Sequence, residues 1–267
     1  MSGATLSVNA MAAPRESTAP DRGAGSFWSF QNYGSVIVRA WRFVMLEAVN
    51  PLIDKKEVPG NLVRAVELLN ELKKQHPAED IIRAKLSHAY YFKGRFQPEG
   101  SREREHLFEL GMESGREAVT LNPRSAYGHF WYAANTGLLG LARGIMQSLR
   151  GIEPMHQSLL TCLKENERFF FAGPHRALGR LYHQAPGWPL SIGSKTKAVE
   201  HLERAVELAP QFFLNRLFLI EFYVDVGKKK QAQEHVDYML NTPMNPDHVI
   251  EDGEYRDQAA KIRQRIM

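Results

Sequence analysis

The sequence predicts an all-α fold in which antiparallel helix pairs stack into a superhelix around one continuous core. Apolar residues recur at helical spacing, the alternation typical of strands is scarce, and one helix–turn–helix unit repeats along the chain. Of 267 residues, 43% are hydrophobic and 24% charged, as in globular proteins. The single cysteine excludes an internal disulfide and a multi-cysteine zinc site. The formal net charge is +4, and the basic residues are not concentrated in a stripe, so we expect no nucleic-acid partner.

The first segment, 1–26, is rich in Ala, Ser, Gly and Pro and has almost no large apolar residue. Such a segment cannot bury enough surface to offset the entropy of ordering it, so we predict a disordered tail. It lacks the charged start and apolar run of a secretory signal, and we therefore expect a cytoplasmic location.

The next segment, 27–59, is predicted to be an N-terminal amphipathic helix and a linker. Arg39 and Arg42 interrupt its apolar stretch 36–49, which excludes a transmembrane span. On a helix the two arginines form a narrow polar stripe. The helix either packs inside the domain or docks on a partner or a membrane surface, so peripheral membrane contact through 27–49 stays open.

Segment 60–243 carries the repeats. The second helix of the unit is clearest at 61–77, where apolar residues at helical spacing precede a proline that ends the helix: Ala65, Leu68, Leu69, Leu72 and Pro77. The same spacing returns at 196–210, with Ala198, Leu202, Ala205 and Pro210. The final segment, 244–267, follows the last repeat and is predicted to be a capping helix.

The first helix of the unit carries a leucine four residues before a tyrosine. The pairs are Leu86/Tyr90, Leu178/Tyr182 and Leu219/Tyr223, with a weaker copy at Tyr132/Thr136. These residues resemble the tetratricopeptide repeat, which has the pattern W-x2-L-G-x2-Y, then A-x3-F, then a proline. The resemblance implies a tetratricopeptide-like α-solenoid, a right-handed superhelical stack of helix pairs.

Two glycines depart from the repeat pattern. Gly111 and Gly115 lie in the middle of the second helix that ends at Pro123, where the repeat has Ala and a large apolar residue. Either two backbones approach closely there, or the helix begins later.

Inserted segments indicate which branch of the tetratricopeptide proteins the sequence resembles. An aromatic string at 129–133 precedes a Gly-rich helix at 137–151, and a loop containing Pro-Gly follows Tyr182. This layout resembles the branch of tetratricopeptide proteins that contains the T-component of tripartite ATP-independent periplasmic transporters and the regulator-of-microtubule-dynamics family.

Catalytic and cofactor motifs are not found. The sequence has no HExxH, CxxC, P-loop, GxGxxG or GxSxG, so we predict no enzyme activity, no cofactor and no metal site. His129 and His175 are interpreted as core-packing residues, and Cys162 as a buried structural thiol.

A binding site is predicted from the resemblance. In this repeat the first helix of each pair lines a concave groove, and the corresponding positions include His88, Tyr91, Phe130, Arg176, Arg180, His183 and Glu221. Arg176 and Arg180 share a helix face with His183, which suits a carboxylate or a phosphate. The alternative is an internal salt bridge with Glu221 or another acid on the next helix.

The sequence therefore predicts a non-enzymatic binding scaffold whose groove holds a protein or peptide partner. The alternative function is a small-molecule binding accessory of a transport system that takes an organic acid, as the resemblance to the T-component implies. A homo-oligomer is compatible with either function.

Overall fold

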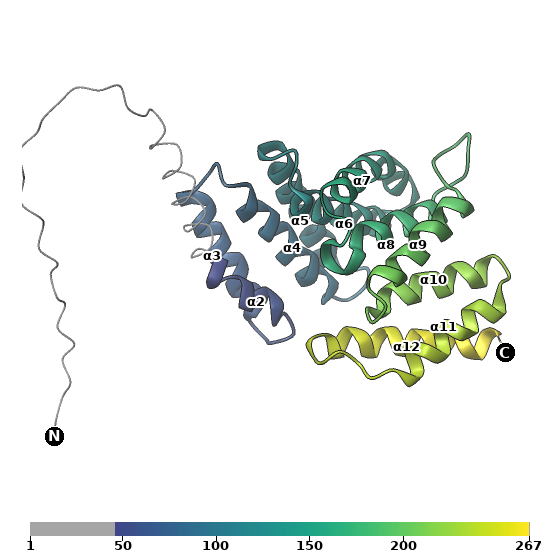
Figure 1. Cartoon of the computed structure of the whole chain (residues 1–267). Coiled ribbons are helices and arrows are strands. Elements are labelled where there is room, and N and C mark those ends of the chain that lie inside the picture. The colour runs from purple at the N-terminus through teal and green to yellow at the C-terminus, as the bar shows by residue number, and fades with distance from the viewer. Residues whose placement is uncertain (1–45, 267) are drawn as a thin grey trace, which may run out of the picture. The chain divides into compact units, whose positions relative to one another are not determined.

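The computed structural model describes residues 46–266 (Figure 1). The predicted tail 1–26 and most of the predicted helix at 27–49 lie outside these residues. The described residues form eleven α-helices, one 3-10 turn and no strand beyond an isolated bridge between Gly187 and Gly193. The predicted all-α fold is confirmed. None of these helices has the length and hydropathy needed to cross a membrane.

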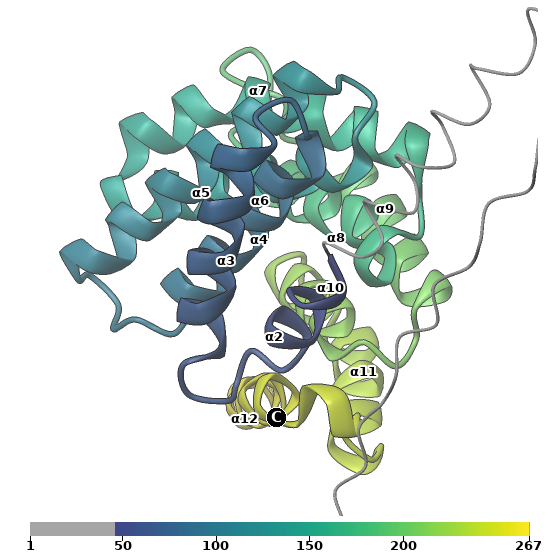
Figure 2. The ribbon, with the colours of Figure 1, turned by 90° about the vertical axis from the view of Figure 1, so that its left-hand side faces the viewer.

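The helices form two layers. Four inner helices contact one another in succession: α4 (Asp80–Arg95), α6 (Ala126–Arg143), α8 (Phe169–Gln184) and α10 (Phe213–Asp225). The outer helices are α3 (Asn61–Gln75), α5 (Arg102–Leu121), α7 (Ile145–Glu165), α9 (Lys195–Leu208) and α11 (Lys229–Asn241). Short helix α2 (Asn50–Asp54) packs on α3, and α12 (Val249–Ile266) packs on α10 and α11 (Figure 2). This is an α-helical solenoid of the tetratricopeptide type.

Serine residues begin three of these helices. The Ser101, Ser125 and Ser194 hydroxyls accept hydrogen bonds from backbone N–H groups in the first turns of α5, α6 and α9, at 3.2, 3.2 and 3.3 Å. Each bond satisfies a backbone donor that has no partner within the helix. These caps fix the residues at which α5, α6 and α9 begin.

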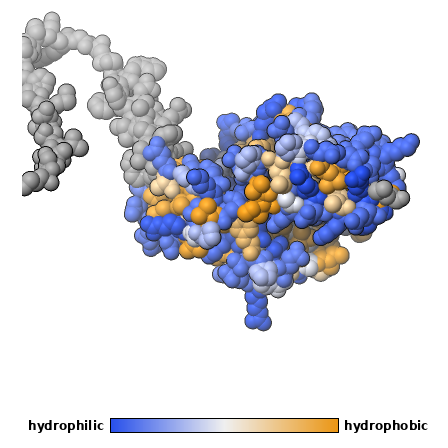
Figure 3. All heavy atoms as spheres, turned by 90° about the horizontal axis from the view of Figure 1, so that it is seen from below, coloured by the Kyte–Doolittle hydropathy of each residue, from blue (hydrophilic) through white to orange (hydrophobic). Residues whose placement is uncertain are grey.

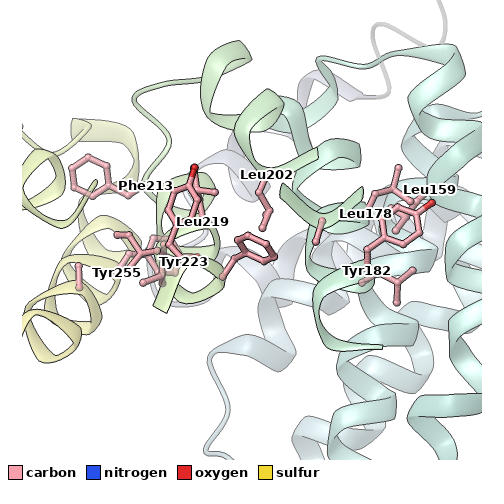
Figure 4. Close-up of a cluster of buried hydrophobic side chains, with 14 of the residues drawn as sticks. Leu159, Leu178, Tyr182, Leu202, Phe213, Leu219, Tyr223 and Tyr255 are labelled. Atoms are coloured by element: carbon pink, nitrogen blue, oxygen red, sulfur yellow. The ribbon is translucent and has the colours of Figure 1, made fainter. Parts of the chain in front are cut away.

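The repeat positions form the core. Leu178, Leu202 and Leu219 are almost fully buried in one apolar cluster that extends from α3 to α12, part of which is shown in Figure 4. Ala198 and Ala205 have no exposed surface, which allows neighbouring helices to approach closely. A second cluster, around Leu69, joins α2, α3 and α4. The apolar spacing that predicted the helices therefore also identifies the face of each helix that is buried.

The two unusual glycines mark a close approach. Helix α5 runs unbroken through both, so it does not begin later. A Cβ at Gly111 would lie 2.3 Å from the Asn135 Oδ1 atom, and one at Gly115 2.7 Å from the Tyr132 Cα atom. Asn135 is fully buried and donates to the Ser87 carbonyl oxygen at 2.9 Å. The glycines therefore let α4, α5 and α6 meet at one hydrogen-bonded contact.

Candidate binding groove

The concave side of the inner layer holds a groove with a volume of about 830 Å³. The C-terminal ends of all four inner helices reach it, through Arg95, Leu141, Gln184 and Asp225. Residues of α7 and α12 complete its walls. The volume falls within the range of about 300–1,000 Å³ that is usual for ligand sites.

Most of the groove lining is apolar. Its aromatic members are Tyr91, Phe92, Phe130, Trp131, Phe170, Phe212, Phe218 and Tyr255, and its aliphatic members include Leu138, Leu141, Ile145, Leu149, Ile152 and Met155. The Trp131 ring lies 4.9 Å from the Phe170 ring and 5.0 Å from the Tyr91 ring, measured between centroids. Such a surface favours apolar side chains of a ligand.

One wall begins at a strained turn. Phe170, Phe171 and Ala172 have φ angles of 44°, 57° and 58°, the left-handed region that residues with a Cβ rarely adopt. The regular part of α8 follows this turn. The Phe171 carbonyl oxygen accepts hydrogen bonds from Arg176 at 3.2 Å and from Asn215 at 3.1 Å. These two buried side chains hold the turn in place.

Arg176 is 4% exposed and lies at the groove. It donates to the Asn215 Oδ1 atom at 2.9 Å, and its guanidinium lies 4.9 Å from the centre of the Phe212 ring. Burial lowers the pKa of Arg176 to about 10. No carboxylate of the described residues forms an ion pair with it, because all its described partners are neutral oxygen atoms and rings.

Arg180 and His183 are each paired with an acid on α10. Arg180 forms an ion pair with Glu221, and its guanidinium lies 4.5 Å from the Phe218 ring centre. The His183 Nε2 atom lies 2.9 Å from the Asp225 Oδ2 atom. Burial, together with the charge of Arg180, lowers the pKa of His183. The internal salt bridge that the sequence offered as an alternative is therefore present at Arg180.

Five of the seven predicted site residues line the groove: Tyr91, Phe130, Arg176, Arg180 and His183. Glu221 is absent from the lining but holds Arg180. His88 departs from the expectation, because it is 7% exposed and its ring stacks at 3.8 Å on the Trp131 ring. Its Nδ1 atom hydrogen-bonds the Tyr127 hydroxyl. His88 therefore packs against Trp131, which lines the groove, and does not line the groove itself.

Helix α12 and the turn before it supply site residues that the sequence did not predict. His248, Glu251 and Tyr255 line the groove. The Lys56 Nζ atom lies 3.2 Å from the Glu251 Oε2 atom, so α12 meets the loop after α2 (Figures 1 and 2). The repeat pattern stops before this helix, and its contacts with the first helices join residues far apart in sequence. Local spacing therefore carries no signal for them.

Of the residues interpreted as structural, Cys162 lies in the core, whereas His129 and His175 are only half-buried. Cys162 is fully buried, and burial raises the pKa of its thiol to about 12. The His129 ring bonds the Pro123 carbonyl oxygen at 2.9 Å, and the Nδ1 atoms of His175 and His201 lie 2.9 Å apart. Within residues 46–266, no three His, Cys, Asp or Glu side chains are arranged to hold a metal ion.

Fold and groove together define a tetratricopeptide-repeat protein. The family described as "Regulator of microtubule dynamics protein 1-3" matches residues 45–173, and the chain resembles that family. A comparison with curated proteins gave no match.

Two solved structures are similar. The crystal structure of TTC0263, a thermophilic tetratricopeptide protein of Thermus thermophilus, has a TM-score of 0.57 at 19% identity. That match covers 81% of this chain and 97% of the other, and it supports the shared fold. Yeast Tom70 matches with a TM-score of 0.31 at 9% identity, over 77% of this chain and 60% of the other.

Proposed function

We propose that this protein is a binding scaffold whose groove holds an apolar segment of a protein partner. The observation that carries the proposal is the lining itself, in which aromatic and aliphatic side chains from α4, α6, α7, α8, α10 and α12 face one cavity. A segment with large apolar side chains would bury them there and leave its polar side toward water.

The charges of the groove support an apolar occupant. Arg180 is paired with Glu221, and the lowered pKa of His183 favours its uncharged ring, so neither residue offers a free positive charge. An anionic ligand that relied on Arg180 would have to displace the Glu221 carboxylate. Apolar contact therefore provides most of the binding energy, and the paired groups near the C-terminal end of α8 favour a polar flank on the partner.

A matched pair of variants on α7 tests this function. Leu149 is 38% exposed and lines the groove, whereas Leu160 is 37% exposed and does not. A displayed peptide library selected on the full chain should yield peptides rich in aromatic and aliphatic residues. Leu149→Glu should weaken their binding at least about tenfold, because it places a charge against apolar side chains.

Leu160→Glu should leave binding unchanged. Selection of acidic or polar peptides, or equal binding by the two variants, would contradict the proposal. Urea unfolding of both variants shows whether each remains folded.

A second candidate function is binding of a small organic acid, and Arg176 favours it. This buried guanidinium lies at the groove and has no carboxylate partner among the described residues. A dicarboxylate would then raise the melting temperature of the parent. The rise should disappear in Arg176→Met, whose own melting temperature without ligand serves as the reference.

A further inference from the structure

The loop between α8 and α9, residues 185–194, exposes two large apolar side chains. Trp188 is 89% exposed and Leu190 84% exposed, the highest values among the large apolar residues of the described chain. Figures 1 and 2 show this loop projecting beyond the helices. Within residues 46–266 the Trp188 ring makes no ring contact and no side-chain hydrogen bond. These side chains therefore do not serve the core.

Backbone bonds hold the loop in a defined shape. The Gly193 N–H donates to the Pro186 carbonyl oxygen at 2.9 Å, and the Leu190 N–H donates to the Gly187 carbonyl oxygen at 3.1 Å. A Cβ at Gly193 would lie 2.1 Å from the Ala185 carbonyl oxygen, so only glycine allows this pairing. The loop thus presents its tip at a fixed position.

A second apolar group lies at the turn between α6 and α7. Ile145 is 75% exposed and Met146 64% exposed. Helices α6 and α8 run in the same direction, because each is followed by an antiparallel outer helix, and both C-terminal ends reach the groove. The turn after α6 and the loop after α8 therefore lie along one edge of the solenoid. We name this edge, with Ile145, Met146, Trp188 and Leu190, the apolar edge.

Basic side chains accompany the apolar edge. Lys195 and Lys197 follow the loop, Lys228–Lys230 form the next turn along the edge, and Arg150 lies near the start of α7. All are exposed, and none forms an ion pair with a carboxylate of the described residues. Carboxylates on the same segments are fewer, namely Glu153, Glu200, Asp225 and Glu234. The edge therefore carries an excess of positive charge.

We propose that the apolar edge docks on the surface of an anionic phospholipid bilayer. Tryptophan favours the headgroup level of a bilayer, because its ring is apolar and its N–H is polar. Lysine and arginine beside inserted apolar residues attract anionic headgroups. Projecting side chains suit a bilayer, which accepts them anywhere on its surface, whereas a protein partner must offer a matching hollow.

Vesicle co-sedimentation of the full chain tests this proposal. The chain should bind phosphatidylcholine vesicles that contain phosphatidylserine, and bind pure phosphatidylcholine more weakly. The double variant Trp188→Ser/Leu190→Ser should lower partition at least about tenfold, since each side chain contributes roughly that factor. Lys195→Glu/Lys197→Glu should lower it by a similar factor, on the anionic vesicles alone.

Matched controls use exposed residues elsewhere. Val63→Ser/Leu121→Ser removes two apolar side chains that are 47% and 43% exposed on α3 and α5, and Lys261→Glu reverses a charge on α12. These variants should bind like the parent. All variants should keep the parent's melting temperature, because the substituted side chains are exposed.

Fluorescence gives a position-specific readout. The difference between the emission of the parent and that of Trp188→Phe reports on Trp188, and it should shift to shorter wavelength on anionic vesicles. Unchanged partition of the Trp188→Ser/Leu190→Ser variant would overturn the proposal, as would an unshifted Trp188 emission. Absence of vesicle binding by the parent would also overturn it, and would assign the projecting loop to a protein partner instead.

Discussion

The guanidinium of Arg95, at the end of α4, donates a hydrogen bond to the phenolic oxygen of Tyr255 in α12 at 3.3 Å. The neighbouring Glu254 Oε2 atom lies 3.3 Å from the Arg95 Nη2 atom. These contacts join the first inner helix of the groove to the last helix of the chain. Helix α12 therefore completes the groove as well as covering the last helix pair.

Loss of the Tyr255 side chain should destabilise the protein. Tyr255 is 6% exposed, and its ring belongs to the core cluster shown in Figure 4. Tyr255→Ala should lower the free energy of unfolding by about 3 kcal/mol, as expected for an aromatic residue removed from a core. Urea unfolding followed by circular dichroism measures this loss.

The neighbouring Glu254→Gln is the control. Its side chain is 52% exposed, so its loss of stability should stay below about 1 kcal/mol. Equal, small losses in both variants would show that α12 does not pack on the solenoid.

Two glycine substitutions should have opposite effects. Gly111→Ala should lower the free energy of unfolding by about 2–3 kcal/mol, since the new Cβ would lie 2.3 Å from the Asn135 Oδ1 atom and displace a buried hydrogen-bonded side chain. Gly253→Ala in α12 meets nothing within 4 Å and should raise stability by about 0.5–1 kcal/mol. A neutral or stabilising effect of Gly111→Ala would contradict the close approach of α5 and α6.

The sequence predicted the helix pairs because, in each repeat, residues close in sequence indicate which face of the helix is buried. Ala198, Leu202 and Ala205 face one side of a helix, and that face is buried against the neighbouring inner helix. The same pattern placed Tyr91 and Phe130 on the groove side. A period of three to four residues is a property of one helix, so it can be read without knowledge of the fold.

The rest of the groove depends on contacts between distant segments. Nothing near Tyr255 in sequence shows that Arg95 is its partner. The left-handed turn at Phe170–Ala172 breaks local backbone preferences and is held by Arg176 and Asn215, which the repeat pattern does not connect. His88 occupies a groove-facing register, but the large rings on α6 cover it. Figure 3 shows a mainly hydrophilic face with separate apolar patches. Several helices contribute to this face, so its pattern also depends on how distant segments pack.

A double-mutant cycle should measure the ion pair of Arg180 with Glu221. Both side chains are 27% exposed, so the coupling free energy should be about 1 kcal/mol rather than the larger value of a fully buried pair. Arg180→Ala, Glu221→Ala and the double variant are compared by urea unfolding. A coupling near zero would show that Arg180 is free to bind an anion.

Acid should destabilise the contact between α8 and α9. Burial, with the nearby His175, lowers the pKa of His201 to about 4, against about 6.5 in the unfolded chain. The folded state therefore favours the neutral ring. This stabilisation is complete above about pH 6.5 and is lost as the pH falls toward 4. After allowance for partial solvent exposure, we expect a loss of about 1–2 kcal/mol.

Unfolding measured at pH 7 and at pH 4 tests this dependence. His201→Gln should reduce the loss of stability between the two pH values, because the variant has no ring to protonate at that position. His106→Gln, at a side chain that is 65% exposed, should keep the parent's dependence. Identical pH profiles for the parent and His201→Gln would exclude His201 as the cause.

Cross-linking at single positions shows whether the groove holds an apolar segment of a protein partner. A photoreactive phenylalanine analogue replaces Leu149, inside the groove, or Leu160, on the same helix but outside it. Each protein is irradiated with the peptide selected by display, and the products are mapped by mass spectrometry. We predict cross-links from position 149 to the apolar residues of the peptide and none from position 160. Equal cross-linking from both positions, or cross-linking from position 160 alone, would contradict the proposed function.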